Sequence, residues 1–475
     1  MVQKAPKSVK KPKQDKGPKL TYDVVVIGGG PAGLMSACIS AENGAKVLLL
    51  EKNEEMGKKL LISGGGRCNI TNADPDKRKF VSKFGKKGDL LFSPLSVFGV
   101  QDTIQFFNNL GVKTKVEAGF RVFPESDNSS DVLEAFVQKA KKVGVEFKTS
   151  AEVMGFKTLS LPSLRGSSRS NPDSDSLDCF ASLAKTEEMD SGLRRNDRKE
   201  EGNDRGKISA VILKNGEEVV GKKFILATGG MSHPETGSTG DGFKWLTEIG
   251  HKVAKPNPSL VPIKISESWI GDFSGITLEN VGISIWQNGT KSINKKGRVL
   301  FTHNGLSGPM ILNMSKDIGD LLQYGEVKVA IDFYSGVGLD EMHENFNKLF
   351  KEHSNKKIKN LVLPEVPAKI FEKILELLEI DGEIEMHSIF REERFSLIEK
   401  LKKFELTVGG LLGFDKAIIS SGGLDLSEVD FKTMGSKLYN NLFFAGDILD
   451  FDRPSGGFSL QLCWTTGYIA GKNIK

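Results

Sequence analysis

Long hydrophobic runs and closely spaced cysteines are both missing from this 475-residue chain. No stretch approaches the roughly 18 consecutive apolar residues that a membrane-spanning helix needs, so we expect no membrane association. The four cysteines, Cys38, Cys68, Cys179 and Cys463, lie far apart and form neither a C-x-x-C nor a C-x₄-C motif. This spacing argues against a dithiol-type flavin reductase and favours a reducing, cytoplasmic location.

An excess of one charge is also absent once residues 1–20 are set aside. That segment holds seven lysines against Asp15, a net charge of +6, whereas the whole chain sums to +5 and residues 21–475 therefore to −1. The segment has no apolar stretch, so it is no signal peptide, and its composition predicts a disordered tail. A neutral body gives no reason to expect a nucleic-acid partner.

A glycine-rich turn near the N-terminus stands out against this background. The β-branched run at 24–27 predicts a buried strand, the motif Gly28-x-Gly30-x-x-Gly33 follows at once, and the apolar spacing of 34–42 predicts a helix. Gly28 permits a tight turn, Gly30 lets the backbone approach a pyrophosphate, and Gly33 lets the helix pack close to the sheet. The helix N-terminus adds free N–H groups, so the segment predicts a dinucleotide-binding unit.

An acidic residue completes this unit. The apolar run at 47–50 predicts a second buried strand and leads into Glu51, about 20 residues beyond the glycines. A carboxylate at that strand end can accept both hydroxyls of an adenosine ribose, and it disfavours a 2′-phosphate. The expected first nucleotide is therefore FAD or NAD rather than NADP.

A second cluster of glycines lies in residues 63–69, SGGGRCN, after a short basic linker. Three consecutive glycines interrupt any helix or strand, so they indicate close approach to a ligand or unusual backbone angles. Beside a dinucleotide, that ligand is a pyrophosphate or a flavin, with Arg67 as a phosphate partner. For Cys68 we favour a small buried side chain over a redox role.

Two later segments predict buried strands that end on cofactor-binding residues. Residues 224–230, FILATGG, end on a glycine pair that offers a second approach to the cofactor, and residues 442–447, LFFAGD, end on Asp447. An aspartate at a strand tip can bind a ribityl hydroxyl, and a helix that opens after Gly456 and Gly457 can point its positive end at the pyrimidine edge of a flavin. NAD needs no such element, so FAD is preferred over NAD.

The pattern of apolar and charged residues changes twice in the middle of the chain. Residues 256–335 hold short alternating runs and turns, which predict a small antiparallel β domain. Residues 336–404 are charged and helical, which indicates a helical subdomain. We therefore expect an α/β protein in which a Rossmann-type domain is split into 21–255 and 405–475.

Residues 160–206 differ in kind from the rest of the first part. They are rich in serine and have almost no apolar periodicity, so we expect a disordered surface insertion between two strands, with no role for Cys179. The extended segment 151–156, which contains Val153, is expected to meet the adenine.

Two histidines are candidates for acid–base chemistry. His303 lies in the glycine-broken loop 301–309, where an acid or base and a structural histidine are equally supported. His233 lies in the polar loop 231–242, and there we favour a loop hydrogen-bonder over a catalytic base. No metal site is expected.

Taken together, these motifs resemble the BaiN/YhiN-like FAD-binding oxidoreductases. The similar segments are IGGGPAGLMSA, SGGGRCN, LATGGMSHPETGSTGDG, LFTHNGLSGP and the C-terminal LFFAGDILDFDRPSGGFSLQLCWTTG. The resemblance implies a split FAD domain interrupted by a β-barrel and a helical domain. The chain departs from it at His233, where the family often has tyrosine, at Ser455, where it has threonine, and in the 160–206 insertion.

The motifs and the resemblance together predict a set of cofactor contacts. Those expected to hold FAD are Gly28, Gly30, Pro31, Ala32, Gly33, Glu51, Lys52, Lys59, Gly66, Arg67, Cys68, Asn69, Val153, Thr228, Gly229, Asp447, Gly456 and Gly457.

No second glycine-rich nucleotide unit is present in the sequence, so NADH or NADPH would act only as a transient reductant. We expect a reductase of an unsaturated or cyclic small organic molecule. One alternative is an oxygen-using oxidase of small amines or aminoketones. Another is a flavoprotein that binds RNA or a protein partner. The sequence does not predict the oligomeric state.

Overall fold

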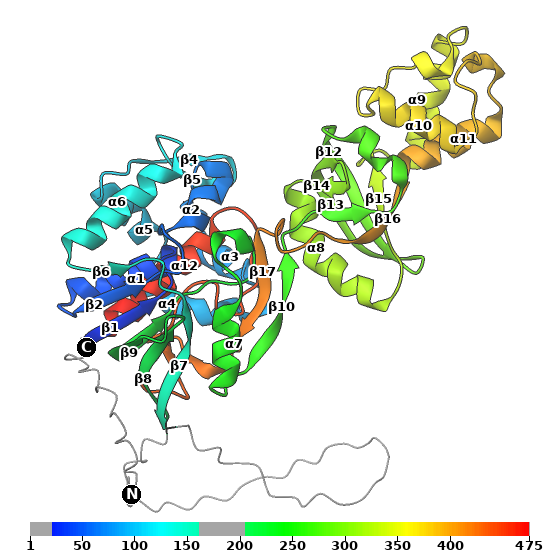
Figure 1. The fold of residues 1–475 in the computed structure, drawn as a ribbon. Coiled ribbons are helices and arrows are strands. Elements are labelled where there is room, and N and C mark those ends of the chain that lie inside the picture. The colour runs from blue at the N-terminus through cyan, green and yellow to red at the C-terminus, as the bar shows by residue number, and fades with distance from the viewer. Residues whose placement is uncertain (1–20, 161–204, 475) are drawn as a thin grey trace, which may run out of the picture.

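The computed structural model describes residues 21–160 and 205–474. The tail predicted at 1–20 and nearly all of the insertion predicted at 160–206, with Cys179, lie outside the described residues. In Figure 1 the blue N-terminal part and the red C-terminal helix share one body, from which a barrel and a helical region project. This confirms the predicted fold class: an α/β protein with a split Rossmann-type domain, an inserted barrel and a helical subdomain.

A parallel sheet forms the centre of the larger body. Its strands run in the order β20 (Leu442–Phe444), β9 (Glu218–Leu226), β1 (Thr21–Ile27), β2 (Val47–Leu50) and β6 (Glu146–Lys148). Ile27 lies beside both Leu50 and Leu226, so the carboxyl ends of the three middle strands meet at one edge. In such sheets ligands bind outside the carboxyl ends of the strands.

Short antiparallel strands extend this sheet. β18 (Val429–Asp430) and β19 (Gly435–Ser436) continue it beyond β20, while β8 (Lys207–Leu213) pairs with β9 and β7 (Val153–Ser160) with β8. The body also contains a small sheet of β3 (Thr71–Asn72), β5 (Arg121–Pro124) and β4 (Thr114–Glu117), and the helices α2 (Lys58–Ile62), α3 (Lys77–Ser82), α4 (Phe92–Val97), α5 (Val100–Asn109), α6 (Ser129–Lys142) and α7 (Asp241–Glu248).

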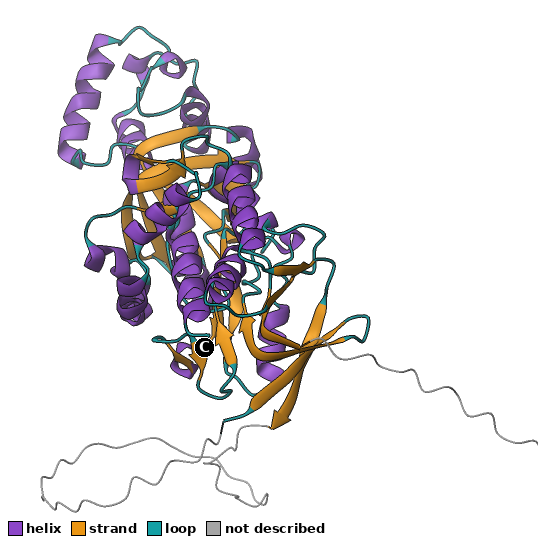
Figure 2. Cartoon of the chain, turned by 90° about the vertical axis from the view of Figure 1, so that its left-hand side faces the viewer, coloured by secondary structure: helices purple, strands orange, loops and turns teal. Residues whose placement is uncertain are grey.

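Helices α1 (Pro31–Glu42) and α12 (Phe458–Lys472) pack against each other although they come from opposite ends of the chain. Glycines on α12 allow the close approach: a Cβ added at Gly467 would lie 2.6 Å from the carbonyl oxygen of Ala32, and one at Gly471 would lie 2.7 Å from that of Ser36. Figure 2 shows helices stacked beside the strands of this body. The split domain is thus joined by direct backbone packing.

The inserted barrel is closed by strands in the order β11-β14-β13-β12-β15-β16. The bounds are β11 (Ile263–Ile265), β12 (Thr277–Gln287), β13 (Thr290–Thr302), β14 (Gly305–Ser307), β15 (Val327–Asp332) and β16 (Phe404–Leu411), with α8 (Pro309–Leu321) after β14. β16 pairs with both β15 and β11. The predicted return to the Rossmann-type domain at 405 is therefore too early, because the strand that closes the barrel follows the helical region.

The helical region consists of α9 (Leu339–Glu352), α10 (Ala368–Leu377) and α11 (Arg391–Lys402), and it shares one hydrophobic core with the barrel. The two chain crossings between the barrel and the larger body pair as β10 (Val253–Ser259) and β17 (Ile419–Leu424). The predicted β domain, which began at 256, therefore includes part of a connecting strand. Within 21–160 and 205–474, no helix combines the length and apolarity needed to cross a bilayer.

The buried His251 contacts two residues next to and within the C-terminal strands β18 and β19 of the larger body. His251 Nδ1 is 2.6 Å from Glu428 Oε2, and its Nε2 is 3.1 Å from Ser436 Oγ. Ser436 Oγ already accepts the backbone N–H groups of Leu438 and Tyr439, so its own proton points to Nε2. The imidazole is therefore neutral, in agreement with the effect of burial, which lowers the pKa of His251.

Candidate functional site

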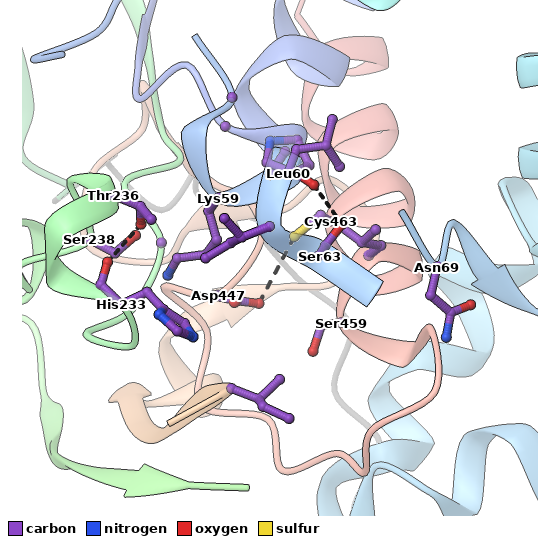
Figure 3. A pocket seen from close by; sticks show the side chains of 18 of the residues that line it. Lys59, Leu60, Ser63, Asn69, His233, Thr236, Ser238, Asp447, Ser459 and Cys463 are labelled. Carbon is purple, nitrogen blue, oxygen red and sulfur yellow. Dashed lines mark hydrogen bonds between the residues drawn. The ribbon is translucent and has the colours of Figure 1, made fainter. Parts of the chain in front are cut away.

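A cavity of about 1100 Å³ opens at the carboxyl edge of the parallel sheet. Its walls include Arg298, Pro309 and Asn313 from the barrel as well as loops of the larger body. Figure 3 shows Lys59, His233, Asp447 and Cys463 around the same space. Of the residues predicted to hold the cofactor, those that line it are Gly28, Gly30, Pro31, Ala32, Glu51, Lys52, Lys59, Arg67, Asn69, Val153, Thr228, Gly229, Asp447, Gly456 and Gly457.

The glycines of the first turn have three different environments. Gly28 has a φ of +109°, and a Cβ there would lie 2.5 Å from the carbonyl oxygen of Ala227. A Cβ at Gly33 would lie 1.8 Å from the carbonyl oxygen of Gly28, so this glycine serves helix–strand packing. A Cβ at Gly30 would meet no protein atom within 4 Å. The turn therefore presents bare backbone to open space at one point, Gly30.

The carboxylate of Glu51 is held at the end of β2. Its Oε2 accepts the backbone N–H of Gly29 at 2.7 Å, and its Oε1 accepts the backbone N–H of Asn53 at 2.9 Å and the Asn53 side-chain Nδ2 at 2.8 Å. The side chain is buried yet lines the cavity. A carboxylate has about four lone-pair sites, and these three hydrogen bonds leave one on Oε2 that can accept a ribose hydroxyl.

Three predicted contacts are not placed in the cavity wall. Gly33 packs beneath the turn, Gly66 lies beside the wall residues Gly64 and Gly65, and Cys68 is buried in the core. Burial raises the pKa of the Cys68 thiol to about 12, which fits the small buried side chain that we favoured. A run of residues in sequence does not show which of its members face a ligand.

Arg67 lines the cavity, but its guanidinium is bound by two carboxylates. It forms an ion pair with Glu117, lies 2.5 Å from Asp127 Oδ1, and stacks over the ring of Phe123 at 4.1 Å. The hydrogen bonds that Arg67 donates to Glu117 and then to Asp127 raise the pKa of Arg67 above its ordinary value. A phosphate would have to compete with both carboxylates, and nothing in the segment around Arg67 indicates that Glu117 and Asp127 lie against it.

Lys59 and Asp447 carry opposite charges into the cavity (Figure 3). Lys59 Nζ donates to Ser232 Oγ at 3.1 Å and forms no ion pair within the described ranges, and burial lowers the pKa of Lys59 below its ordinary value. Asp447 Oδ1 lies 2.5 Å from Nη2 of Arg453, whose side chain is almost fully buried. Sequence reasoning missed Arg453; its place between Gly446-Asp447 and Gly456-Gly457 was the available signal.

The N-terminus of α12 reaches the cavity through Gly456 and Gly457. Gly457 has a φ of +100°, and a Cβ there would lie 2.4 Å from the carbonyl oxygen of Thr71. No side chain caps this helix start, nor that of α1. Both helices therefore leave N–H donors and a positive dipole end directed to this edge of the sheet.

The two candidate histidines have different positions. His303 is exposed in the turn between β13 and β14 and does not line the cavity, so its proposed acid–base role is not supported by its position. His233 lines the cavity with a φ of +50°, and its Nδ1 lies 2.8 Å from Glu235 Oε1. No described residue hydrogen-bonds its Nε2, which leaves that nitrogen for a ligand.

These residues fit FAD. Bare backbone at Gly30 and two uncapped helix starts suit a pyrophosphate, Glu51 suits a ribose, and Asp447 suits a ribityl chain. Within residues 21–160 and 205–474, no three His, Cys, Asp or Glu side chains are placed to hold a metal ion. Fold and site together define the class of flavin-dependent oxidoreductases built on a Rossmann-type domain.

The chain belongs to the HI0933-like family, whose Rossmann-domain model matches residues 22–173 and 167–473. It is an FAD-dependent oxidoreductase, as the resemblance to BaiN/YhiN-like proteins implied. It is 26% identical over 450 residues to a 3-dehydro-bile acid delta(4,6)-reductase of Clostridium scindens, covering 94% of this chain and 97% of that protein. It is 25% identical over 456 residues to a ribosomal RNA dihydrouridine synthase of Escherichia coli, covering 95% and 98%.

A solved structure of 3-ketosteroid-delta4-(5alpha)-dehydrogenase from Rhodococcus jostii covers 97% of this chain and 98% of its own, at 13% identity and a TM-score of 0.47. A likeness at that level carries no argument about activity.

Proposed function

We propose that the protein reduces a carbon–carbon double bond conjugated to a carbonyl in a cyclic substrate, with NADH or NADPH as the source of electrons. The observation that carries this proposal is the extent of the cavity. It continues from Gly30 at the sheet edge to Arg298 and Asn313 of the barrel, so it has walls for a second molecule beyond a dinucleotide.

The two relatives support the same bond type. The name of one describes a reductase of a bile acid with 4,6 unsaturation, and the name of the other describes a synthase of dihydrouridine. Dihydrouridine is uridine whose ring double bond, conjugated to a carbonyl, has been reduced. A steroid enone and a uracil ring therefore present the same reacting group.

The chain's own residues would bind and orient both partners. When bound, FAD would supply the hydride chemistry. The turn at Gly28 and Gly30 and the start of α1 would hold its pyrophosphate, with Glu51 on the ribose. Reduction also adds one proton to the substrate, and His233, whose Nε2 has no described partner, would donate it while Glu235 holds the imidazole through Nδ1.

The test begins with a visible spectrum of the purified protein. NADH and then NADPH are added without oxygen while the flavin band is followed, and a cyclic enone is added once the band has bleached. We expect bleaching with one nicotinamide and recovery of the band with the enone. Bleaching by an amine, and by neither nicotinamide, would instead favour the oxidase. A protein that neither carries nor takes up FAD would contradict the cofactor assignment.

We also propose a reducing, cytoplasmic location. The support is that Cys38, Cys68 and Cys463 are free thiols. Rapid alkylation in intact cells followed by mass analysis tests this, and disulfide-linked cysteine peptides would contradict it.

A further inference from the structure

The mouth of the cavity has a rim that neither the cofactor contacts nor the proton donor explain. We define the cavity rim as Lys79, Lys83, Phe120 and Arg121, all exposed and all part of the cavity wall. The two lysines lie on and just after α3, Phe120 ends the turn from β4 to β5, and Arg121 is the first residue of β5. Sequence segments about 40 residues apart therefore meet at the opening.

Phe120 is held in a strained backbone conformation and is partly exposed. Its φ is +61°, which residues other than glycine, asparagine and aspartate rarely adopt, and the residue is 44% exposed. The turn is fixed around it: Ala73 N–H donates to the Phe120 carbonyl at 2.7 Å, and Asn72 Nδ2 donates to the Gly119 carbonyl at 3.0 Å. A phenylalanine that stays 44% exposed gains less from burial than a core phenylalanine does to offset this strain. Such outliers gather at ligand sites.

The rim also carries positive charge that the protein does not neutralise. Lys83 and Arg121 form no ion pair with any described residue, although Arg121 Nε donates to the Ala118 carbonyl at 3.0 Å and its guanidinium lies 5.6 Å from the centre of the Phe123 ring. Lys79 has one long contact, 3.4 Å to Asp74. The nearby carboxylates Glu117 and Asp127 are already bound by Arg67 and Lys115. An anion at the rim would therefore meet two cations without a carboxylate partner among the described residues, on the same cavity wall as Phe120.

We propose that the cavity rim binds the substrate, with Phe120 stacked on its ring and Lys83 and Arg121 on a negatively charged group. This rests on the proposed function and narrows its substrate class to planar, conjugated ring compounds that carry an anion. The anion is either the carboxylate of a small molecule or the phosphate of a nucleotide. Aromatic stacking supplies orientation, and the cations supply selection for charge.

The experiment measures binding to the oxidised, FAD-loaded protein, so it does not depend on turnover. The probes are a 3-oxo-4-ene steroid with a side-chain carboxylate, the neutral 4-androstene-3,17-dione, uridine 5′-monophosphate and a short uridine-containing RNA. Each is titrated while the flavin absorbance is followed. Tighter binding of the RNA than of the mononucleotide identifies a nucleic acid as the source of the anion, and tight binding of the carboxylate steroid identifies a small molecule.

Charge and stacking are separated by two sets of variants. Lys83→Glu and Arg121→Glu should each raise the Kd of whichever anionic probe the wild-type protein binds by about tenfold or more. The Kd of the neutral steroid should change by less than about twofold. Phe120→Leu should raise the Kd of all probes that contain a ring, by about the same factor for each of them. Phe92→Leu is the matched control, since Phe92 is 43% exposed outside the cavity wall, and it should change no affinity.

Phe120→Asn gives a readout that a structural role cannot produce. Asparagine tolerates a positive φ, so this variant should raise the melting temperature by about 1 °C or more while it weakens ring binding. A lower melting temperature with unchanged affinity would mean that Phe120 only packs. Wild-type protein that binds none of the probes, or variants that change only the KM for the nicotinamide, would overturn the proposal. Probe binding without flavin reoxidation would instead contradict the proposed reductase and leave the rim assignment standing.

Discussion

Alanine at Gly30 and alanine at Gly33 should act on different properties of the protein, although the two positions are one helical turn apart. A methyl group at Gly30 would meet no protein atom within 4 Å, and the φ of −79° is one that alanine adopts freely. A methyl group at Gly33 would lie 1.8 Å from the carbonyl oxygen of Gly28. The first change fills space that the protein leaves to a ligand, and the second forces α1 away from β1.

The size of each effect follows from these contacts. An ordinary contact begins at 3.4 Å, so the alanine at Gly33 requires a displacement of about 1.5 Å in a packed core. Overpacking of this kind costs about 3 kcal/mol or more, which should lower the melting temperature of the apoprotein by about 5 °C. At Gly30 the apoprotein should be unchanged. A methyl group that collides with the bound pyrophosphate should cost about 1–3 kcal/mol of affinity, or roughly 5- to 150-fold.

Two measurements on each variant decide the matter: thermal unfolding without cofactor, and titration with FAD followed by flavin fluorescence. We expect Gly30→Ala to melt like wild type and bind FAD weakly. If Gly30→Ala binds FAD as tightly as wild type does, the pyrophosphate does not cross Gly30 and the assignment of the turn is wrong. If apo Gly33→Ala is as stable as wild type, the packing argument fails instead.

Three further predictions concern buried groups. Burial raises the pKa of Cys38 and Cys68 to about 12 and also raises the pKa of Cys463. None of these three thiols should therefore react with maleimide in the folded protein at pH 8. Peptide mass analysis of protein labelled before and after unfolding checks this. The pKa of His251 is lowered in the folded protein, so the unfolded chain binds the proton first as the pH falls below about 6.5. The free energy of unfolding should therefore decrease on acidification. His251→Gln should reduce this dependence of the free energy of unfolding on pH, as measured by denaturant titrations. Arg453→Met should leave Asp447 without its ion-pair partner and destabilise the protein by about 3–5 kcal/mol. Asp447→Asn in the same background should recover part of that loss. If no stability is recovered, loss of the ion pair is not the cause of the destabilisation.

The features that could be predicted from sequence are those whose cause lies within a few tens of residues. The strand, glycine turn, helix, strand and Glu51 of the first unit depend on one another locally, and the structure has them in that order. The strand before Asp447 and the helix after Gly457 are local in the same sense. Each of these strands, turns and helices can be predicted from the spacing of apolar residues and the position of a glycine within one short segment.

The features that could not be predicted depend on partners far away in the chain. β16 closes the barrel only because β11 lies beside it, and β10 leaves the barrel to pair with β17. Arg67 reads as a phosphate ligand until Glu117 and Asp127 are seen against it. His303 reads as a pocket residue until the β13–β14 turn is seen to project into solvent.

The same distinction explains why the cofactor end of the cavity was easier to identify than its mouth. Cofactor binding uses backbone N–H groups and strand ends, whose positions follow from glycines and apolar runs. Substrate selection uses side chains that meet only in the folded chain, such as Phe120 from the β4–β5 turn and Lys83 after α3. A strained φ at a large exposed residue leaves no mark in composition or periodicity, because phenylalanine there breaks a local preference instead of following one. In this protein, therefore, the residues that sequence reasoning missed at the cavity mouth are the ones that we expect to distinguish it from relatives with the same cofactor.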